Sequence, residues 1–233
     1  FELHTYGALG AVAFLVIVSI ALWRSKALGL NPDRVVDVIF YTSLVSIAGS
    51  RLLYVVQNPE NFKTLWDVVN IRTGGLVFYG ALVTGLPVAG LLMRRYNLPF
   101  YKLMDIFATT FPIAHAITRM GCFAAGCCYG VPTDKSWGVI FTDPRSVAPL
   151  HVALHPTQLY EVGTNLIIAA AVWWQYGRKK FDGQAMLLYL MLYAATRSLN
   201  EMFRGDAERG YFMKDVFGEV LSLSQGISIV VAL

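Results

Sequence analysis

Charged residues are scarce in this chain. Asp, Glu, Lys and Arg make up only 15% of its 233 residues, whereas they make up about a quarter of an ordinary soluble domain. Hydrophobic residues make up 56%, and the mean hydropathy is +0.52. This composition excludes an ordinary soluble domain and indicates a polytopic membrane protein. At roughly 20 residues per helical span, the chain has room for about seven spans.

The sequence also lacks low-complexity segments, tandem repeats and long linkers, so we expect a single domain over residues 1–233. No patch interleaves basic with aromatic side chains, and we therefore expect no nucleic-acid partner. No lysine or arginine precedes the first apolar run, whereas Arg24 and Lys26 follow it. This order is the reverse of that in a cleavable signal peptide, so we expect the run to be a membrane span.

Cysteine is limited to three residues, Cys122, Cys127 and Cys128. An odd number clustered in one short stretch is not a disulfide framework. The spacing C-x4-C-C does not match a zinc site, and a C-x-x-C redox pair is absent. Cys122 could still bridge to Cys127 or Cys128 in an oxidising compartment. We favour a structural role in shaping a loop over a nucleophilic one, and we expect no metal and no cofactor.

The apolar runs predict seven transmembrane helices, at residues 6–23, 35–56, 75–93, 98–117, 158–176, 186–202 and 216–233. Between the second and third runs, the polar, tryptophan-bearing segment 57–74 is predicted to form an interfacial arm. Residues 128–156 are rich in Pro, Asp, Ser and Thr and include β-like pieces such as WGVIF. This segment is predicted to form a small extramembrane cap. The predicted fold is an all-α polytopic membrane protein.

The distribution of lysine and arginine predicts the orientation. The loops after the first, third and fifth runs carry Arg24, Lys26, Arg34, Arg94, Arg95, Lys102, Arg178, Lys179 and Lys180. The loops of the other side contain more acidic residues among their basic ones. The positive-inside rule therefore places the N-terminus outside and the C-terminus in the cytoplasm. The cap and the arm would then share the outer, periplasmic face.

Three arginines lie within or at the ends of the apolar runs: Arg51, Arg119 and Arg197. An arginine at membrane depth is costly unless it has an anionic partner, so it marks a candidate functional site. Three cations at similar depth repel one another, and a shared anion is the economical explanation. The guanidinium fork suits phosphate in particular. The alternative is that each arginine pairs with a separate acid such as Asp105 or Glu201.

Two further patterns lie beside these arginines. Arg197, Glu201 and Arg204 are spaced i, i+4 and i+7, which places them on one face of a helix. The stretch 118–130, TRMGCFAAGCCYG, combines an arginine with cysteines and glycines. Its glycines permit positive φ angles and close backbone approach, so we expect a loop wrapped around a ligand after the end of a helix.

The segment HPTQLYE, residues 155–161, has a proline near the predicted start of a helix. It places Gln158 and Glu161 one turn apart. From the residues alone it is a polar helix entrance, and a single histidine such as His155 is more often a hydrogen-bonded structural residue than a catalyst.

The sequence resembles the prolipoprotein diacylglyceryl transferase family over nearly its whole length. Six motifs in the family's order carry the resemblance: HTYG (4–7), GSRLLYV (49–55), GGLVFYGALVTG (74–85), TRMGCFAAGCCYG (118–130), HPTQLYE (155–161) and R-x-x-x-E-x-x-R (197–204). The fourth looks like the signature G-R-x-G-N-F-x-N-G-E-x-x-G, and the fifth is nearly identical to the family motif.

The chain departs from the family pattern at four of these positions. Tyr79 stands where most members have a histidine that is proposed to act as a base. Thr118, Cys122 and Cys127 replace the leading glycine, the asparagine and the glutamate of the signature. The arginines are kept while these groups change, so we interpret the chain as a divergent branch. Because tyrosine has a reference pKa of about 10, we expect Tyr79 to hydrogen-bond lipid phosphate or glycerol.

The resemblance implies transfer of diacylglyceryl from phosphatidylglycerol to the lipobox cysteine of preprolipoproteins. It implies a monomer without cofactor in the bilayer of the bacterial inner membrane, crossing it several times. The resemblance implies catalytic roles for Arg119, Arg197, Tyr79 and Glu201. It implies substrate contacts for Tyr6, Arg51, Cys122, Gly130, His155, Gln158, Glu161 and Arg204. The alternatives are a non-catalytic phospholipid-binding paralogue and a membrane thiol–disulfide enzyme using the cysteines.

Overall fold

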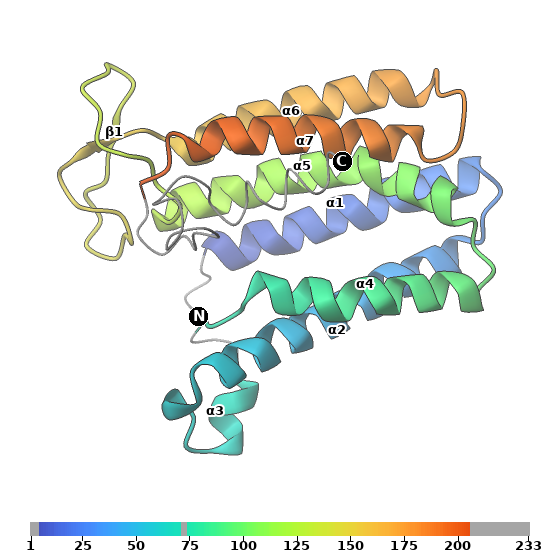
Figure 1. The fold of residues 1–233 in the computed structure, drawn as a ribbon, viewed down its shortest axis with the longest axis horizontal. Coiled ribbons are helices and arrows are strands. Elements are labelled where there is room, and N and C mark those ends of the chain that lie inside the picture. The colour runs from blue at the N-terminus through green and yellow to red at the C-terminus, as the bar shows by residue number, and fades with distance from the viewer. Residues whose placement is uncertain (1–4, 71–73, 206–233) are drawn as a thin grey trace, which may run out of the picture. The chain divides into compact units, whose positions relative to one another are not determined.

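A computed structural model describes residues 5–70 and 74–205 (Figure 1). Its elements are α1 (Thr5–Ala27), α2 (Pro32–Gln57), the 3-10 helix η1 (Pro59–Asn61), α3 (Leu65–Val69), α4 (Phe78–Arg95), α5 (Phe100–Ala125), β1 (Val139–Ile140), β2 (Ala153–Leu154), α6 (Thr157–Tyr176) and α7 (Gln184–Glu201). The predicted all-α character is confirmed, and six of the seven predicted apolar runs are helices. The seventh, 216–233, lies outside the described residues.

The chain divides into two compact units. The first unit comprises Phe1–Ile20 and Met104–Leu233, and the second comprises Ala21–Leu103. Among the described residues, α1 and α2 have the length and the apolar composition that a membrane-crossing helix needs. The number of spans and their orientation stay predictions, as does the expectation that both units act as one domain.

In the second unit, α2 packs against α4 through small residues. A Cβ atom added to Gly80 would lie 2.3 Å from the carbonyl oxygen of Gly49, so only glycine permits this approach. The Thr84 hydroxyl donates to the carbonyl of Val45 across the same contact, at 3.2 Å. Close packing of small residues with interhelical hydrogen bonds is typical of helices in membranes, where no hydrophobic force drives helices together.

The predicted arm, residues 57–74, connects α2 to α4 and contains η1 and α3. Helix α3 begins with a capping box in which Thr64 and Asp67 satisfy each other's backbone N–H groups. Leu65 and Trp66 on this short helix are 86% and 72% exposed. Large apolar side chains of this kind favour the expected interfacial location, because tryptophan is enriched at membrane–water boundaries.

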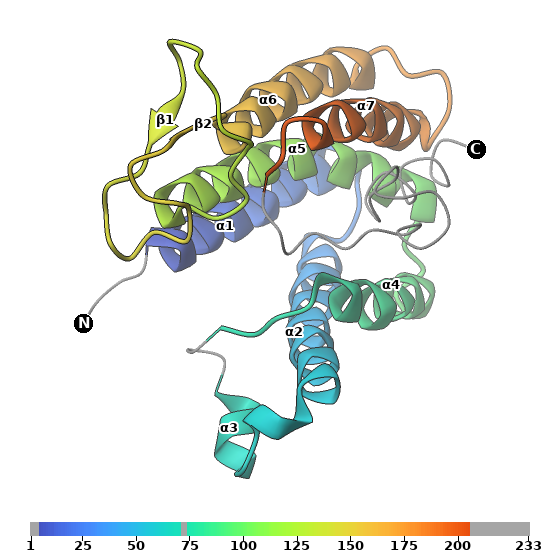
Figure 2. The same cartoon turned by 60° about the vertical axis from the view of Figure 1, so that its left-hand side comes forward.

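In the first unit, α5, α6 and α7 run side by side (Figures 1 and 2). Ala108 of α5, Ile168 and Val172 of α6 and Ala185 of α7 form a fully buried cluster between them. Beside this cluster the carboxylate of Asp105 accepts hydrogen bonds from the first backbone N–H groups around α7. The donors are Gly183 at 2.8 Å, Ala185 at 2.9 Å and Met186 at 3.1 Å.

The role of Asp105 corrects one alternative from the sequence. Its carboxylate also pairs with Lys179 at 2.9 Å. It therefore caps a helix and neutralises a lysine, and it is not the partner of one of the candidate-site arginines. An anion at a helix N-terminus is stabilised by the unpaired N–H groups there, which explains this placement.

The predicted cap contains a short antiparallel pair, in which Val139 pairs with Leu154 and Ile140 with Ala153. This confirms the β-like piece expected from the sequence. The N–H of Gly130 donates to the carbonyl of His155 at 3.0 Å. The N–H of Val131 donates to the carbonyl of Phe203 at 2.9 Å, just after α7. The cap is thereby attached to the entrance of α6 and the exit of α7.

Helix α5 is longer than predicted. The sequence predicted a helix ending near residue 117 and a loop from 118 to 130, but the helix continues to Ala125. Arg119 and Cys122 are therefore helical, and the loop is confined to the last few residues of the stretch. Gly121 lies inside the helix, where an added Cβ would be 3.2 Å from the ring of Tyr6 on α1. The helix continues because Arg119, Met120 and Ala124 are good helix formers, and it ends before Gly126, whose φ is +70°.

Candidate functional site

The partner of Arg119 is Glu161, in the first turns of α6. The Nε of Arg119 forms an ion pair with Oε2 of Glu161. The Glu161 side chain is only 5% exposed, and that of Arg119 is 14% exposed. A buried carboxylate without a cation is very costly, so this pair joins α5 to α6 at a fixed point.

Arg197 of α7 reaches the same carboxylate. Its Nη1 lies 3.6 Å from Oε1 of Glu161 and 2.6 Å from Oε2 of Glu201. The Nδ2 of Asn200 donates to Oε1 of Glu161 at 2.7 Å. Glu161 therefore joins three helices, and the predicted i, i+4 pair of Arg197 with Glu201 is confirmed. The alternative expected from the sequence is thus met in part, because Arg197 pairs with Glu201, but Arg119 and Arg197 also share contacts with Glu161.

His115 lies one turn before Arg119 on α5. Its Nε2 accepts a hydrogen bond from Nε of Arg119 at 3.1 Å and lies 3.5 Å from Oε2 of Glu161. The same Nε of Arg119 also pairs with Glu161. His115 therefore lies against the Arg119–Glu161 pair and helps to position it.

Each arginine keeps donors that no described residue uses. Within the described ranges, hydrogen bonds and ion pairs engage Nε and Nη1 of Arg119 and only Nη1 of Arg197. The side chain of Arg197 is 10% exposed. Two guanidinium groups that share a carboxylate and still offer N–H donors can bind a further anion through charge-assisted hydrogen bonds.

The start of α6 holds the loop that follows α5. The Thr157 hydroxyl donates to the carbonyl of Cys128 at 2.7 Å, and Nε2 of Gln158 donates to the carbonyl of Cys127 at 2.7 Å. Thr157, Gln158 and Glu161 are all buried. The motif that reads as a polar helix entrance thus has two functions. Its first residues clamp the cysteine loop, and Glu161 holds the arginines.

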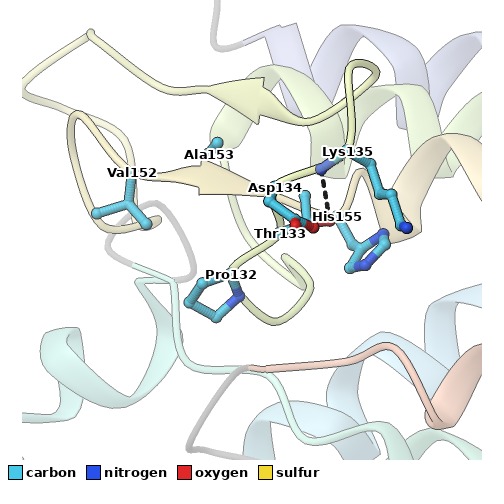
Figure 3. A pocket seen from close by; sticks show the side chains of 7 residues that line it. All are labelled: Pro132, Thr133, Asp134, Lys135, Val152, Ala153 and His155. Carbon is cyan, nitrogen blue, oxygen red and sulfur yellow. Dashed lines mark hydrogen bonds between the residues drawn. The ribbon is translucent and has the colours of Figure 1, made fainter.

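His155 belongs to the cap. Its Nδ1 is 2.9 Å from the hydroxyl of Tyr160, which also accepts from Nε1 of Trp137 at 2.9 Å. An open hollow of about 520 Å³ lies along the cap, lined by Pro132, Thr133, Asp134, Lys135, Val152, Ala153 and His155. Figure 3 shows these side chains and the bond from the Lys135 N–H to the Thr133 hydroxyl. Of the predicted site residues, His155 alone lines this hollow.

Arg51, in the second unit, holds the arm. All five of its N–H donors bind backbone carbonyls, at distances of 2.6–3.1 Å. The acceptors are the carbonyl oxygens of Asp67, Val68, Asn70, Gly74 and Gly75. The guanidinium is buried and lies 5.1 Å from the ring of Phe62. These contacts give Arg51 a structural role in this unit, and its expected contact with a shared anion stays a prediction.

The remaining predicted residues lie in several places. Tyr79 is in the first turn of α4, in the second unit. Tyr6 is in the first turn of α1 and contacts the helix at Gly121. Gly130 is required where it stands, because an added Cβ would lie 2.5 Å from the carbonyl of His155. Arg204 follows α7 and forms an isolated bridge with Gly130. Their roles toward a substrate stay predictions.

Sequence reasoning missed two residues of this cluster, His115 and Asn200. The signal was present in the spacing. His115 lies four residues before Arg119, and Asn200 lies three residues after Arg197. Residues at these separations share a helix face, so the polar side chains nearest each arginine were candidates for its surroundings.

Fold and site together define a helical protein of membrane type, with two arginines of different helices on one buried carboxylate. The model of the prolipoprotein diacylglyceryl transferase family matches residues 1–233, and the chain belongs to this family. The membership expected from the six motifs is confirmed, and the divergent branch stays an interpretation.

Three relatives carry the same name, phosphatidylglycerol–prolipoprotein diacylglyceryl transferase. The chain is 31% identical to that of Clostridium tetani over 228 residues, covering 98% of this chain and 88% of the relative. It is 33% identical to that of Thermotoga maritima over 214 residues, covering 89% and 72%. It is 32% identical to that of Legionella pneumophila strain Corby over 234 residues, covering 95% and 88%.

Proposed function

We propose that the chain transfers the diacylglyceryl group of phosphatidylglycerol to the lipobox cysteine thiol of a preprolipoprotein. The names of its relatives and its family membership support this reaction. The acceptor sulfur attacks the glycerol carbon that carries the phosphate ester. A carbon–sulfur bond forms, the carbon–oxygen bond to phosphate breaks, and glycerol phosphate leaves. The thiol proton ends on the departing phosphate or in solvent.

The observation that carries the proposal is the pair of arginines on Glu161. In this reaction negative charge grows on the phosphate oxygen that leaves, and fixed donors aimed at it lower the barrier. Arg119 and Arg197 have N–H groups available for that purpose. Arg204, on the chain just after α7, supplies a further cation in our proposal.

Glu161 and Glu201 act as positioning residues in this mechanism. Two carboxylates offset the charges of two arginines, so the empty cluster does not suffer strong repulsion between guanidinium groups. Phosphate is then recognised by charge and by directed hydrogen bonds from the N–H groups that the carboxylates leave available. Hydrogen bonds to charged groups contribute about 1.5–3 kcal/mol each.

The acceptor thiol reacts as its thiolate. The family's histidine is replaced by Tyr79, and Nε2 of His115 contacts the Arg119–Glu161 pair. Positive charge beside a thiol favours the thiolate, so we assign its activation to the field of the arginines that bind the phosphate.

The finer features of the proposal follow from the sequence. The chain crosses the bacterial inner membrane several times as a monomer, with the cap and the arm outside, where preprolipoproteins present their lipobox. Both substrates then approach the site from the bilayer side or the outer face.

Complementation tests the proposal directly. The chain is produced in a bacterial strain depleted of its own diacylglyceryl transferase, and lipoprotein maturation is followed by the mobility shift of a lipoprotein. Restored maturation is the expected result. A folded chain that binds phosphatidylglycerol but leaves lipoproteins unmodified would replace this proposal by the lipid-binding alternative.

A further inference from the structure

The sulfur atoms of the three cysteines converge. The Sγ atoms of Cys122, Cys127 and Cys128 all lie within 4.8 Å of one another. Cys122 is buried in the last turn of α5, and the other two lie in the loop that follows. The spacing C-x4-C-C argued against a metal site, but the turn at Gly126, with φ of +70°, folds the loop back. The turn therefore brings the three sulfur atoms together.

Backbone contacts hold this loop. The N–H of Cys127 donates to the carbonyl of Cys122 at 3.1 Å, and the side chains of Thr157 and Gln158 hold the carbonyls of Cys128 and Cys127. Cys128 has φ of +58°, a conformation that non-glycine residues adopt at a cost. Such a conformation persists where the surroundings enforce it, and it is concentrated at functional sites.

The sulfur atoms contact one another and the groups around them. The three thiols form side-chain hydrogen bonds with one another. Sγ of Cys127 lies 3.7 Å from the carbonyl of Cys122, and Nη1 of Arg119 lies 3.9 Å from Sγ of Cys122. The three sulfur atoms therefore face one common point.

Distance and charge both fit a metal ion. A zinc–thiolate bond is about 2.3 Å, which places neighbouring sulfurs of one site roughly 3.8–4.0 Å apart. The three Sγ atoms lie within 4.8 Å of one another, a limit that is compatible with this separation. Three thiolates around Zn²⁺ carry one net negative charge, and the guanidinium of Arg119, which also pairs with Glu161, lies beside Cys122. Thiolates are the ligands that select thiophilic metals over Mg²⁺ and Ca²⁺.

We propose that Cys122, Cys127 and Cys128 form a three-thiolate site for a thiophilic metal ion, with Zn²⁺ as the ion whose charge fits its surroundings. Thr157 and Gln158 are its positioning residues, since they hold the two loop cysteines in place. The site stands on the geometry of the cysteines alone and does not depend on the transferase reaction.

The test uses the whole chain, purified in detergent without a polyhistidine tag and reduced with a phosphine. It is incubated with Zn²⁺, freed of loose metal, and analysed for zinc and protein. We expect one Zn²⁺ per chain, sulfur neighbours at about 2.3 Å by X-ray absorption, and protection of all three thiols from alkylation. A chain that retains no zinc, or whose thiols alkylate equally fast with and without zinc, overturns the proposal.

Variants separate the site from adventitious binding. Each of Cys122→Ser, Cys127→Ser and Cys128→Ser is expected to weaken zinc binding roughly 100-fold or more, and Thr157→Val roughly 10-fold, as for lost outer contacts of a metal site. Met120→Leu, which removes a sulfur from the same turn of α5, is the matched control and should bind like the parent chain. Zinc binding that survives the triple serine variant overturns the proposal. The zinc content and the thiol protection of the parent chain test the proposal without any variant, so the test remains decisive even if a variant does not fold.

Discussion

The carboxylate of Glu161 pairs with the guanidinium of Arg119 inside the first unit, and this contact joins α6 to α5. Arg197, which pairs with Glu201, also reaches the Glu161 carboxylate from α7, so one acidic residue links both cations. A carboxylate shared in this way is a positioning device, because each guanidinium is held by one edge while other N–H groups stay available. The predictions below start from this arrangement.

Replacing Glu161 by glutamine keeps the shape and removes the charge. Two buried guanidinium groups would then lose their shared partner, and breaking a buried pair typically costs about 3–5 kcal/mol. We expect a markedly lower melting temperature and loss of transferase activity. The control is Asp143→Asn, which breaks the exposed pair with Arg145 and should cost less than about 1 kcal/mol. Equal melting temperatures for the two variants would contradict the central role of Glu161.

Replacing Arg119 or Arg197 by glutamine should lower the transfer rate roughly 100-fold, because a donor to the developing oxyanion is lost. Lysine should restore only part of the rate, since it keeps the charge but not the planar fork. The measurement is thioether formation on a lipobox peptide in phosphatidylglycerol micelles, with folding checked by thermal melting.

Arg145→Gln, in the cap, serves as the control arginine and should leave the rate unchanged. Folded Arg119→Gln and Arg197→Gln proteins that both stay within about threefold of the parent rate would show that these arginines are anchors and do not bind phosphate.

Replacing Arg51 by lysine should release the arm. An ammonium group has three donors and no planar fork, so it cannot hold the five carbonyls that Arg51 binds. We expect limited proteolysis to cut residues 57–74 roughly tenfold faster, since each unsatisfied carbonyl costs about 1–3 kcal/mol. Lys63→Gln, an exposed cation of the same arm, is the control. Unchanged cleavage of Arg51→Lys would refute its structural role.

The loop between α6 and α7 should show a defined dependence on pH. Burial alone would lower the pKa of Lys179, but hydrogen bonds to Asp105 and Asp182 outweigh this effect and raise it. A raised pKa in the folded state means that the charged lysine stabilises the fold fully below its unfolded pKa of about 10.4. This contribution is lost as the pH rises through the folded pKa.

The melting temperature of Lys179→Met should therefore lie below that of the parent chain at neutral pH, and the two should approach each other at strongly alkaline pH. Lys180→Met is the neighbouring control. A difference that stays constant across the alkaline range would show that packing of the lysine stem, and not its charge, carries the effect.

The orientation can be tested with single accessible tags. A tag near residue 140, in the cap, should be reached by a protease or impermeant reagent from outside intact cells. Tags near Arg94 or Lys179 should be reached only after the inner membrane is opened, because basic loops stay in the cytoplasm. Access to residue 140 from the cytoplasm alone would invert the proposed arrangement of the site.

The sequence by itself determined the class of the protein and the order of its parts. Apolar runs of membrane length predict helices because a backbone in lipid must satisfy its own hydrogen bonds, and six of these runs are helices in the structure. The arginines, the Arg197–Glu201 pair and the HPTQLYE segment were found from spacing, because neighbours within one helix are separated by three or four residues.

Only the tertiary structure decided which groups meet across helices. Glu161 lies 42 residues after Arg119 and 36 before Arg197 in the sequence, and no local pattern announces that the three share one point. The end of α5 is set by the positive φ at Gly126, and Arg119 therefore lies inside the helix. The three cysteine sulfur atoms come together because the chain turns at Gly126 with a positive φ. Arg51 can bind five backbone carbonyls only because the arm folds around it. All of these contacts join residues that are far apart in the sequence, and their energies depend on how deeply the groups are buried. The spacing of residues along the chain shows neither property.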